Sequence, residues 1–128
     1  MDLQREYTPP EVGAGSNSTR YAYDPDKQLT RITRPDAQIL DFGYDTAGGC
    51  NCGRLSTLTL PTGVSTFAYD ATTGKLTGIN APDGSTLSYT YSGSLLTQTT
   101  WAGTVAGNVG RTYDSDFRVT SLSVNGSN

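Results

Sequence analysis

The stretch "YDATTGKLTGINAPDGSTLSYTY", residues 69–91, contains one complete structural unit and decides the fold. It opens with a Tyr-Asp pair, runs through a short Thr-rich segment and turns at a Pro-Asp-Gly sequence. Pro presets the backbone at the first turn position, Asp can bond its own backbone and Gly tolerates a positive φ, so this sequence predicts a hairpin tip. Beyond it, Leu87, Tyr89 and Tyr91 alternate with polar residues, which predicts a strand with one apolar face.

The Tyr-Asp pair recurs along the chain. The pairs are Tyr23-Asp24, Tyr44-Asp45, Tyr69-Asp70 and Tyr113-Asp114, and Tyr91 followed by Ser fills the gap in the series. Successive tyrosines of this series are 21, 25, 22 and 22 residues apart. Such a period indicates an internal repeat whose units cannot bury their apolar faces alone and stack on one another.

A second series lies between the pairs, in which a Leu is followed six residues later by a Pro. Its members are Leu29 with Pro35, Leu55 with Pro61, Leu76 with Pro82, and Leu3 with Pro9. A glycine two residues after the Pro recurs as Gly63 and Gly84. Leu95 and Trp101 keep the spacing, with Trp in the Pro place, so Trp101 is expected in an exposed turn and is the best single candidate for a surface contact.

Aromatic side chains recur at one phase of each unit. They are Tyr21, Tyr23, Phe42, Tyr44, Phe67, Tyr69, Tyr89 and Tyr91. We expect them to form the core stripe between stacked hairpins, and the alternative is a stacking platform for sugars.

The segment before each hairpin tip is less regular. Apolar residues three apart, Leu29 and Ile32 or Leu76 and Ile79, would point to opposite faces of an ideal strand. A β-bulge near the middle of the strand would bring them to the same face. Spacing three also suits a helix, but short Thr-rich stretches bounded by Pro and Gly disfavour helix, and none is expected.

The predicted fold is therefore all-β, with tandem antiparallel hairpins stacked into one continuous curved sheet. Residues 1–128 form a single array of about five and a half units, whose first and last units are incomplete. Open strand edges at both ends would pair with neighbouring repeats of a longer parent chain or with another copy.

Tyr-Asp pairs about 22 residues apart, joined by Leu-Thr and Pro-Asp-Gly sequences, resemble the RHS or YD-repeat family, over about residues 3–124. That family includes bacterial Rhs polymorphic toxins, the C component of insecticidal toxin complexes, wall-associated proteins and teneurins. The resemblance implies a hairpin ribbon that spirals into a hollow shell, in bacteria around a C-terminal toxin, and a secreted or cell-surface location. This chain departs from the pattern in being too short to enclose a folded toxin, and the self-cleavage signature "DPxGL" has no match.

Charge and composition exclude several classes of function. A net charge of −3 and an isoelectric point near 4.6 give no broad positive field for nucleic acid. No apolar run reaches the roughly 18 residues of a membrane span. The chain has no histidine, which removes the commonest general base, so we expect no enzyme and no catalytic residue.

Two groups of side chains could in principle bind a metal ion, namely the repeated aspartates and the two cysteines. The aspartates of the Tyr-Asp pairs could bind calcium or act in glycosyl transfer, but turn capping at each unit explains their phase better. Cys50 and Cys52 in "GGCNCG" are expected to be loop thiols, with a strained disulfide or a metal shared between chains as alternatives. No cofactor or metal site is predicted.

The sequence thus predicts a non-catalytic structural segment of a shell that encloses or presents a toxin or effector domain outside this chain. A cell-surface adhesion or carbohydrate-binding module is the alternative. An enzyme using paired aspartates is a third reading, for which no particular pair stands out.

Overall fold

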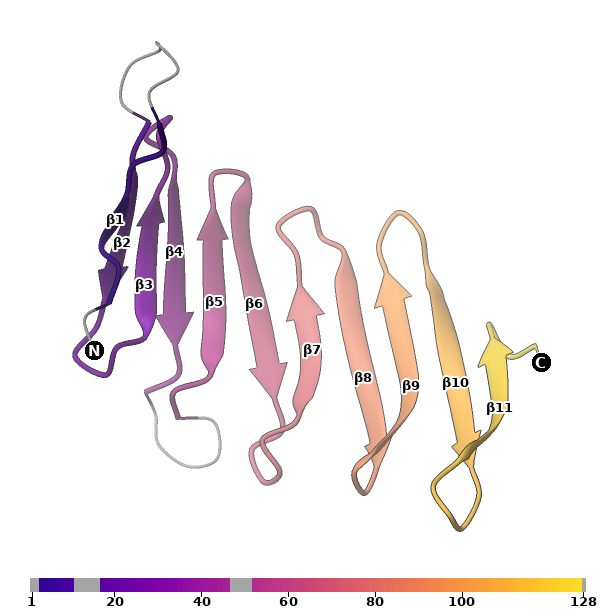
Figure 1. Cartoon of the computed structure of the whole chain (residues 1–128). Coiled ribbons are helices and arrows are strands. Elements are labelled where there is room, and N and C mark those ends of the chain that lie inside the picture. Colours follow the sequence, from indigo (N-terminus) through magenta and orange to yellow (C-terminus); the bar gives the residue numbers. More distant parts are fainter. Residues whose placement is uncertain (1–2, 11–16, 47–51, 128) are drawn as a thin grey trace.

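The computed structural model describes residues 3–10, 17–46 and 52–127, and these form one antiparallel β-sheet (Figure 1). Its strands follow one another in chain order, and each pairs with the next. They are β1 (Glu6–Tyr7), β2 (Thr19–Tyr23), β3 (Leu29–Thr33), β4 (Ile39–Tyr44), β5 (Leu55–Leu60), β6 (Gly63–Tyr69), β7 (Leu76–Asn80), β8 (Thr86–Ser92), β9 (Leu95–Ala102), β10 (Gly107–Tyr113) and β11 (Val119–Val124).

The array of tandem hairpins is confirmed, and the sheet is open. β1 and β11 lie at its opposite edges and pair with one neighbour each. The described residues contain no helix, and hence none long and apolar enough to cross a membrane.

The hairpin tip predicted at Pro82-Asp83-Gly84 is present in the structure. The Gly84 amide donates to the carbonyl of Ala81 at 3.1 Å, and Gly84 has a φ of +83°. Asp83 caps the tip, because its Oδ1 accepts the Ser85 amide hydrogen at 2.9 Å. This is the three-residue hairpin loop in which a left-handed residue closes a type I turn.

The turns at Pro35 and Pro61 vary this design. The loop after Pro35 has the same hydrogen bonds, with Ala37 taking the positive φ of +62° in place of Gly. Pro61 belongs to a two-residue loop, because Leu60 pairs directly with Gly63. Gly63 has a φ of +133°, and a Cβ added there would lie 2.5 Å from the Cβ of Pro82, so this turn packs against the next hairpin tip.

A bulge is present beside each of the five repeat tyrosines, but it lies near the start of the strand and not near its middle as predicted. It directly follows the repeated Leu, or Val119 in the last unit. Tyr23 pairs with Leu29 while Ala22 pairs with Arg31, which leaves Thr30 as the extra residue. The same shift occurs beside Tyr44, Tyr69, Tyr91 and Tyr113, with the extra residues Ser56, Thr77, Thr97 and Thr120. The bulge turns residues three apart toward one face, as with Leu29 and Ile32. Every bulged residue carries a hydroxyl group.

The expectation of a buried aromatic core is wrong for this chain. Among the described residues no hydrophobic side chain is fully buried, and the eight repeat aromatics are all half-buried. The physical reason is that a core needs two packed layers, whereas these strands supply a single sheet.

Candidate functional site: the apolar face of the sheet

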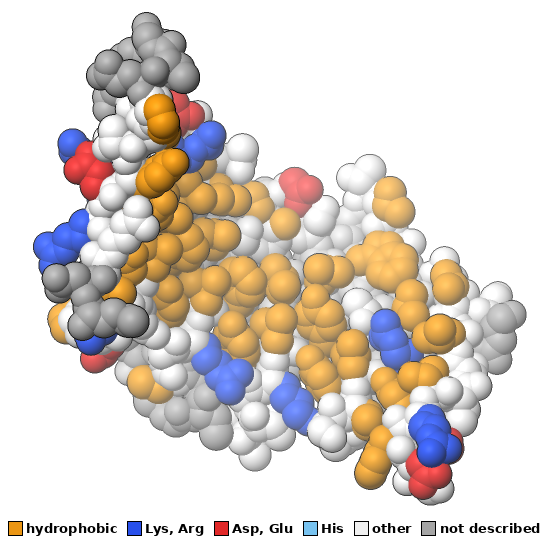
Figure 2. Space-filling model, viewed as in Figure 1, with side chains coloured by type: hydrophobic (Ala, Val, Ile, Leu, Met, Phe, Trp, Pro, Cys, Tyr) orange, Lys and Arg blue, Asp and Glu red, His pale blue; other side chains and the backbone are white. Residues whose placement is uncertain are grey.

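One face of the sheet carries nearly all the large apolar side chains, and we call it the apolar face. The register places Tyr21 opposite Ile32, Phe42 opposite Leu58 and Phe67 opposite Ile79. Figure 2 shows hydrophobic side chains running as a continuous band across the sheet. The residues of this face that the repeat aligns are Tyr21, Tyr23, Leu29, Ile32, Leu40, Phe42, Tyr44, Leu55, Leu58, Phe67, Tyr69, Leu76, Ile79, Leu87, Tyr89, Tyr91, Leu96, Trp101, Tyr113, Val119 and Leu122.

The tyrosine of each unit binds the strand before it through its hydroxyl group. Tyr44 donates to the carbonyl of Leu29 at 2.9 Å, and Tyr69 donates to that of Leu55 at 2.9 Å. The same bond joins Tyr91 to Leu76 at 2.9 Å, Tyr113 to Leu96 at 2.7 Å and Tyr23 to Gln4 at 3.0 Å. The repeated Tyr and Leu are therefore partners, and each hydroxyl satisfies a backbone carbonyl at the end of a hairpin.

A second series of contacts joins successive units at the Tyr-Asp turns. Gln28 Nε2 donates to the carbonyl of Gly53 at 2.8 Å. Arg54 donates in the same way to Gly74, and Lys75 to Gly93. In each case the residue before the repeated Leu reaches the turn of the next unit. Gln28, Arg54 and Lys75 share one position of the repeat, since each stands directly before the repeated Leu.

Arg54 and Lys75 also cover aromatic rings of the apolar face. The Arg54 guanidinium lies 5.4 Å from the ring centre of Tyr69, and Lys75 Nζ lies 5.2 Å from that of Tyr91. Both distances suit a cation–π interaction. Lys27, by contrast, is exposed in its turn, where it takes a positive φ of +66°.

The aspartates of the Tyr-Asp pairs accept hydrogen bonds from the backbone of their own turns. Asp24 Oδ1 accepts the Gln28 amide hydrogen at 2.8 Å, and Asp114 Oδ1 accepts that of Arg118 at 2.9 Å. Asp70 Oδ1 accepts both the amide and the hydroxyl of Thr73, at 2.6 and 2.8 Å. For Asp45 the contact is between backbone groups, because its amide donates to the carbonyl of Arg54 at 2.8 Å. The carboxylates of Asp24, Asp70 and Asp114 thus have the geometry expected of turn caps.

The bonds to Thr73 lower the pKa of Asp70 below its ordinary value, and the bonds to Ser85 lower that of Asp83. Both pKa values are thus shifted in the direction opposite to the raised pKa that a general acid needs.

The described residues offer no metal centre, since no group of three or more acidic, Cys or His side chains comes together among them. Cys52 is an exposed free thiol, and its neighbour Cys50 lies outside the described residues. The predicted states of the cysteine pair therefore remain predictions.

Trp101 does not occupy an exposed turn, and that expectation is wrong. It lies inside β9, paired with Leu87 on one side and Gly107 on the other, and it is half-buried. The error came from taking Leu95 as the repeated Leu of this unit. Tyr91 pairs with Leu96, so Leu96 is the repeated Leu. Trp101 therefore corresponds to Leu60, the last residue of β5, and not to a Pro of a turn. Trp101 lines a hollow of about 220 Å³ with Ile79, Leu87 and Val105.

Arg111 breaks the aromatic series. It stands two residues before Tyr113, where the other units carry Tyr21, Phe42, Phe67 and Tyr89. It is half-buried, lies opposite Leu122 and donates from Nη1 to Thr99 Oγ1 at 3.4 Å.

The chain matches the family model described as Teneurin YD-shell over residues 5–128. The chain belongs to this YD-shell family. The RHS and YD-repeat resemblance is thus confirmed, and with it the structural, shell-like character of the fold. The search for curated relatives found no match.

Solved structures of toxin complexes share the YD-shell fold with this chain. The Tc holotoxin pore of Photorhabdus luminescens is similar with a TM-score of 0.69 and 20% sequence identity, over 85% of this chain and 5% of that one. The crystal structure of TcdB2-TccC3 is similar with a TM-score of 0.67 and 18% identity, over 84% of this chain and 6% of that one. This YD-shell chain thus spans only about one twentieth of the length of these structures.

Proposed function

We propose that this chain is a non-catalytic wall segment of a YD-repeat shell that encloses or presents a toxin or effector domain outside these 128 residues. The observation that carries the proposal is the hydrogen-bonded linkage of each unit to the next. Tyrosine hydroxyls hold each hairpin together, and Gln28, Arg54 and Lys75 tie successive hairpins at their turns. Such a sheet extends by adding units, which suits a wall.

The apolar face supports the same function. Most of its aromatic and aliphatic side chains are half-buried, and Leu87, Val119 and Leu122 are exposed, so the face is suited to being covered by another layer or by an enclosed polypeptide. The proposed location is outside the cell or on its surface. Any catalytic activity of the parent protein would reside in the enclosed domain. The repeated Tyr, Asp, Leu, Pro and Gly positions of this chain would hold the wall together.

The native protein tests this function directly. An antibody raised against the 128 residues identifies the native polypeptide, whose intact mass and peptide map are then measured. We expect a mass far above 13.6 kDa and a separate fragment that resists protease until denaturant opens the shell. A native product close to 13.6 kDa, with no protected fragment, would contradict enclosure.

A carbohydrate-binding or adhesion module is the second candidate, and the hollow beside Trp101 is the observation that favours it. The indole is half-buried next to an apolar hollow of about 220 Å³, a setting in which a sugar ring could stack. Because Trp101 is the only tryptophan, its fluorescence reports this site alone. Quenching by one member of a carbohydrate panel supports binding, and an unchanged spectrum across the panel contradicts it.

A further inference from the structure

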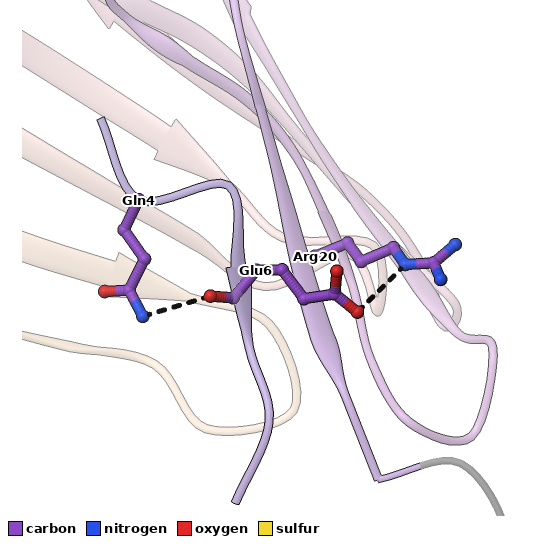
Figure 3. Close-up of polar contacts among 3 residues, drawn as sticks. All are labelled: Gln4, Glu6 and Arg20. Carbon is purple, nitrogen blue, oxygen red and sulfur yellow. Dashed lines mark hydrogen bonds and ion pairs between the residues drawn. The ribbon is translucent and has the colours of Figure 1, made fainter. Parts of the chain in front are cut away.

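Charge is distributed unevenly between the two faces of the sheet. On the face opposite the apolar one, cations in strands are matched with carboxylates: Arg31 Nε lies 2.5 Å from Asp41 Oδ1. Arg20 likewise pairs with Glu6 at 3.5 Å across β1 and β2, and Figure 3 shows these two side chains pointing toward each other. The charges of that face therefore cancel in pairs.

The apolar face carries basic side chains. None of the described strands places an Asp or Glu on it, whereas β10 places Arg111 there. Arg54 and Lys75 lie over aromatic rings of the same face. Figure 2 shows Lys and Arg side chains within and beside the hydrophobic band, and Asp and Glu at its margins. Within the described strands the charge on this face is thus positive, in a chain whose net charge is −3.

Among the basic side chains of the apolar face, Arg111 is the best candidate for binding an acidic group, because it forms no ion pair with a described residue. The one hydrogen bond that its side chain makes to a described residue is the long bond to the neutral Thr99 hydroxyl. A half-buried guanidinium has lost part of its hydration, and a carboxylate can restore it through two parallel hydrogen bonds.

The surroundings of Arg111 are apolar and accessible. Across from it on β11 lie Val119, Leu122 and Val124, with exposed fractions of 51%, 57% and 54%. With Arg111 and Tyr113 they form what we call the β10–β11 patch. An apolar surface around one cation fits a ligand that has apolar groups around one anion.

We propose that the β10–β11 patch binds an extended acidic-apolar polypeptide segment, whose apolar side chains cover β11 and whose Asp or Glu carboxylate pairs with Arg111. The proposal rests on the proposed shell function, because the wall's apolar face is where an enclosed or presented segment would lie. It goes further by stating the chemistry of that segment. Charge complementarity selects it over a basic segment, and the apolar neighbours of Arg111 select a polypeptide over a simple anion such as phosphate.

Three matched peptides test the proposal on the full 128-residue chain. Each is a fluorescein-labelled peptide of about twelve residues with alternating Val and Thr, and they differ only in a central Glu, Gln or Lys. Fluorescence polarisation gives their dissociation constants. The Glu peptide is expected to bind roughly tenfold more tightly than the Gln peptide, the usual effect of one charge-assisted hydrogen-bonded pair, and the Lys peptide more weakly than either.

Variants then assign the preference to Arg111. Arg111→Tyr restores the aromatic of the other units, so it should fold with an undiminished melting temperature while abolishing the preference for Glu over Gln. Arg111→Lys should retain part of that preference. Arg20→Gln, which removes a cation of the opposite face, should leave it unchanged.

Each other outcome overturns the proposal. If the three peptides bind equally, or none binds, the acidic segment is wrong, while the mass and protease protection of the native protein decide the shell function separately. If inorganic phosphate displaces the Glu peptide as well as unlabelled peptide does, Arg111 is a general anion site. If Arg20→Gln weakens binding as much as Arg111→Tyr, the effect is one of overall charge.

Discussion

The hydroxyl group of Tyr69 donates a 2.9 Å hydrogen bond to the carbonyl of Leu55 on the neighbouring strand, and the bond recurs with the period of the sequence. The Tyr of each unit and the Leu of each unit are therefore not two independent features. The Leu begins a hairpin, and the Tyr that ends the hairpin closes it on the Leu carbonyl. This explains why the two series keep the same phase along the chain.

Removing that hydroxyl should destabilise the sheet by a small and measurable amount. Tyr69→Phe keeps the ring and loses the bond to Leu55, and we expect the free energy of unfolding in urea to fall by about 1 kcal/mol. Tyr89→Phe is the matched control, because the Tyr89 hydroxyl makes no hydrogen bond to a described residue, and its effect should be close to zero. Equal losses in the two variants would mean that the tyrosine hydroxyls do not hold the hairpins together.

Gly63 should be far less tolerant of substitution than Gly84. Gly63 has a φ of +133°, a region open in practice to glycine alone, and a new Cβ would meet Pro82 at 2.5 Å. Gly84, with a φ of +83°, has open space around it, so Gly84→Ala carries only the backbone penalty of about 1 kcal/mol. Gly63→Ala should cost roughly 2 to 3 kcal/mol or more, since strain and collision add. Thermal unfolding compares the two, and an equal loss would show that the Pro82 contact is unimportant.

The hairpins, their tips and their bulges could be predicted because local chemistry determines them. Pro-Asp-Gly favours one kind of turn, alternation favours one face, and apolar residues three apart in a strand require a bulge. These rules act within about ten residues, so a single unit such as residues 69–91 contains all the information needed.

What could not be predicted depends on contacts between units or on a second layer. Leu95 and Leu96 are adjacent and equally apolar, so only pairing with Tyr91 shows which is the repeated Leu and hence where Trp101 lies. Burial depends on what covers the sheet, which the repeat itself does not encode. The bond from Lys75 to the turn at Gly93 spans two units, beyond the reach of local patterns.

The half-buried state of the apolar face lowers the expected cost of losing an aromatic ring. Tyr89→Ala would remove roughly 3 kcal/mol or more of stability from an enclosed core, but Tyr89 keeps part of its surface in contact with solvent. We expect a loss of about 1.5 kcal/mol in urea unfolding of the isolated chain. Thr90→Ala, an exposed neighbour, is the control and should change little. A loss above roughly 3 kcal/mol would indicate that another layer, such as a second copy, buries the ring in solution.

Acid should weaken the turn that Asp70 caps. The amide and hydroxyl of Thr73 donate to its carboxylate and lower its pKa, so folding is favoured while the group is charged. That stabilisation is fully present above the unfolded-state pKa of about 4 and is lost as the pH falls through the lower pKa of the folded state. Asp70→Asn should therefore reduce the slope of melting temperature against pH below about pH 4.

The matched control for acid sensitivity is Asp26→Asn, which makes the same charge change at another Tyr-Asp turn. Asp26 accepts no hydrogen bond from a described residue, whereas Asp70 accepts several from its own turn. Melting curves recorded from neutral pH down to about pH 2 should separate the two variants, with Asp26→Asn keeping the slope of the unmodified chain. If Asp70→Asn keeps that slope as well, the carboxylate contributes no pH-dependent stability, and the capping bonds to Thr73 are not maintained in solution.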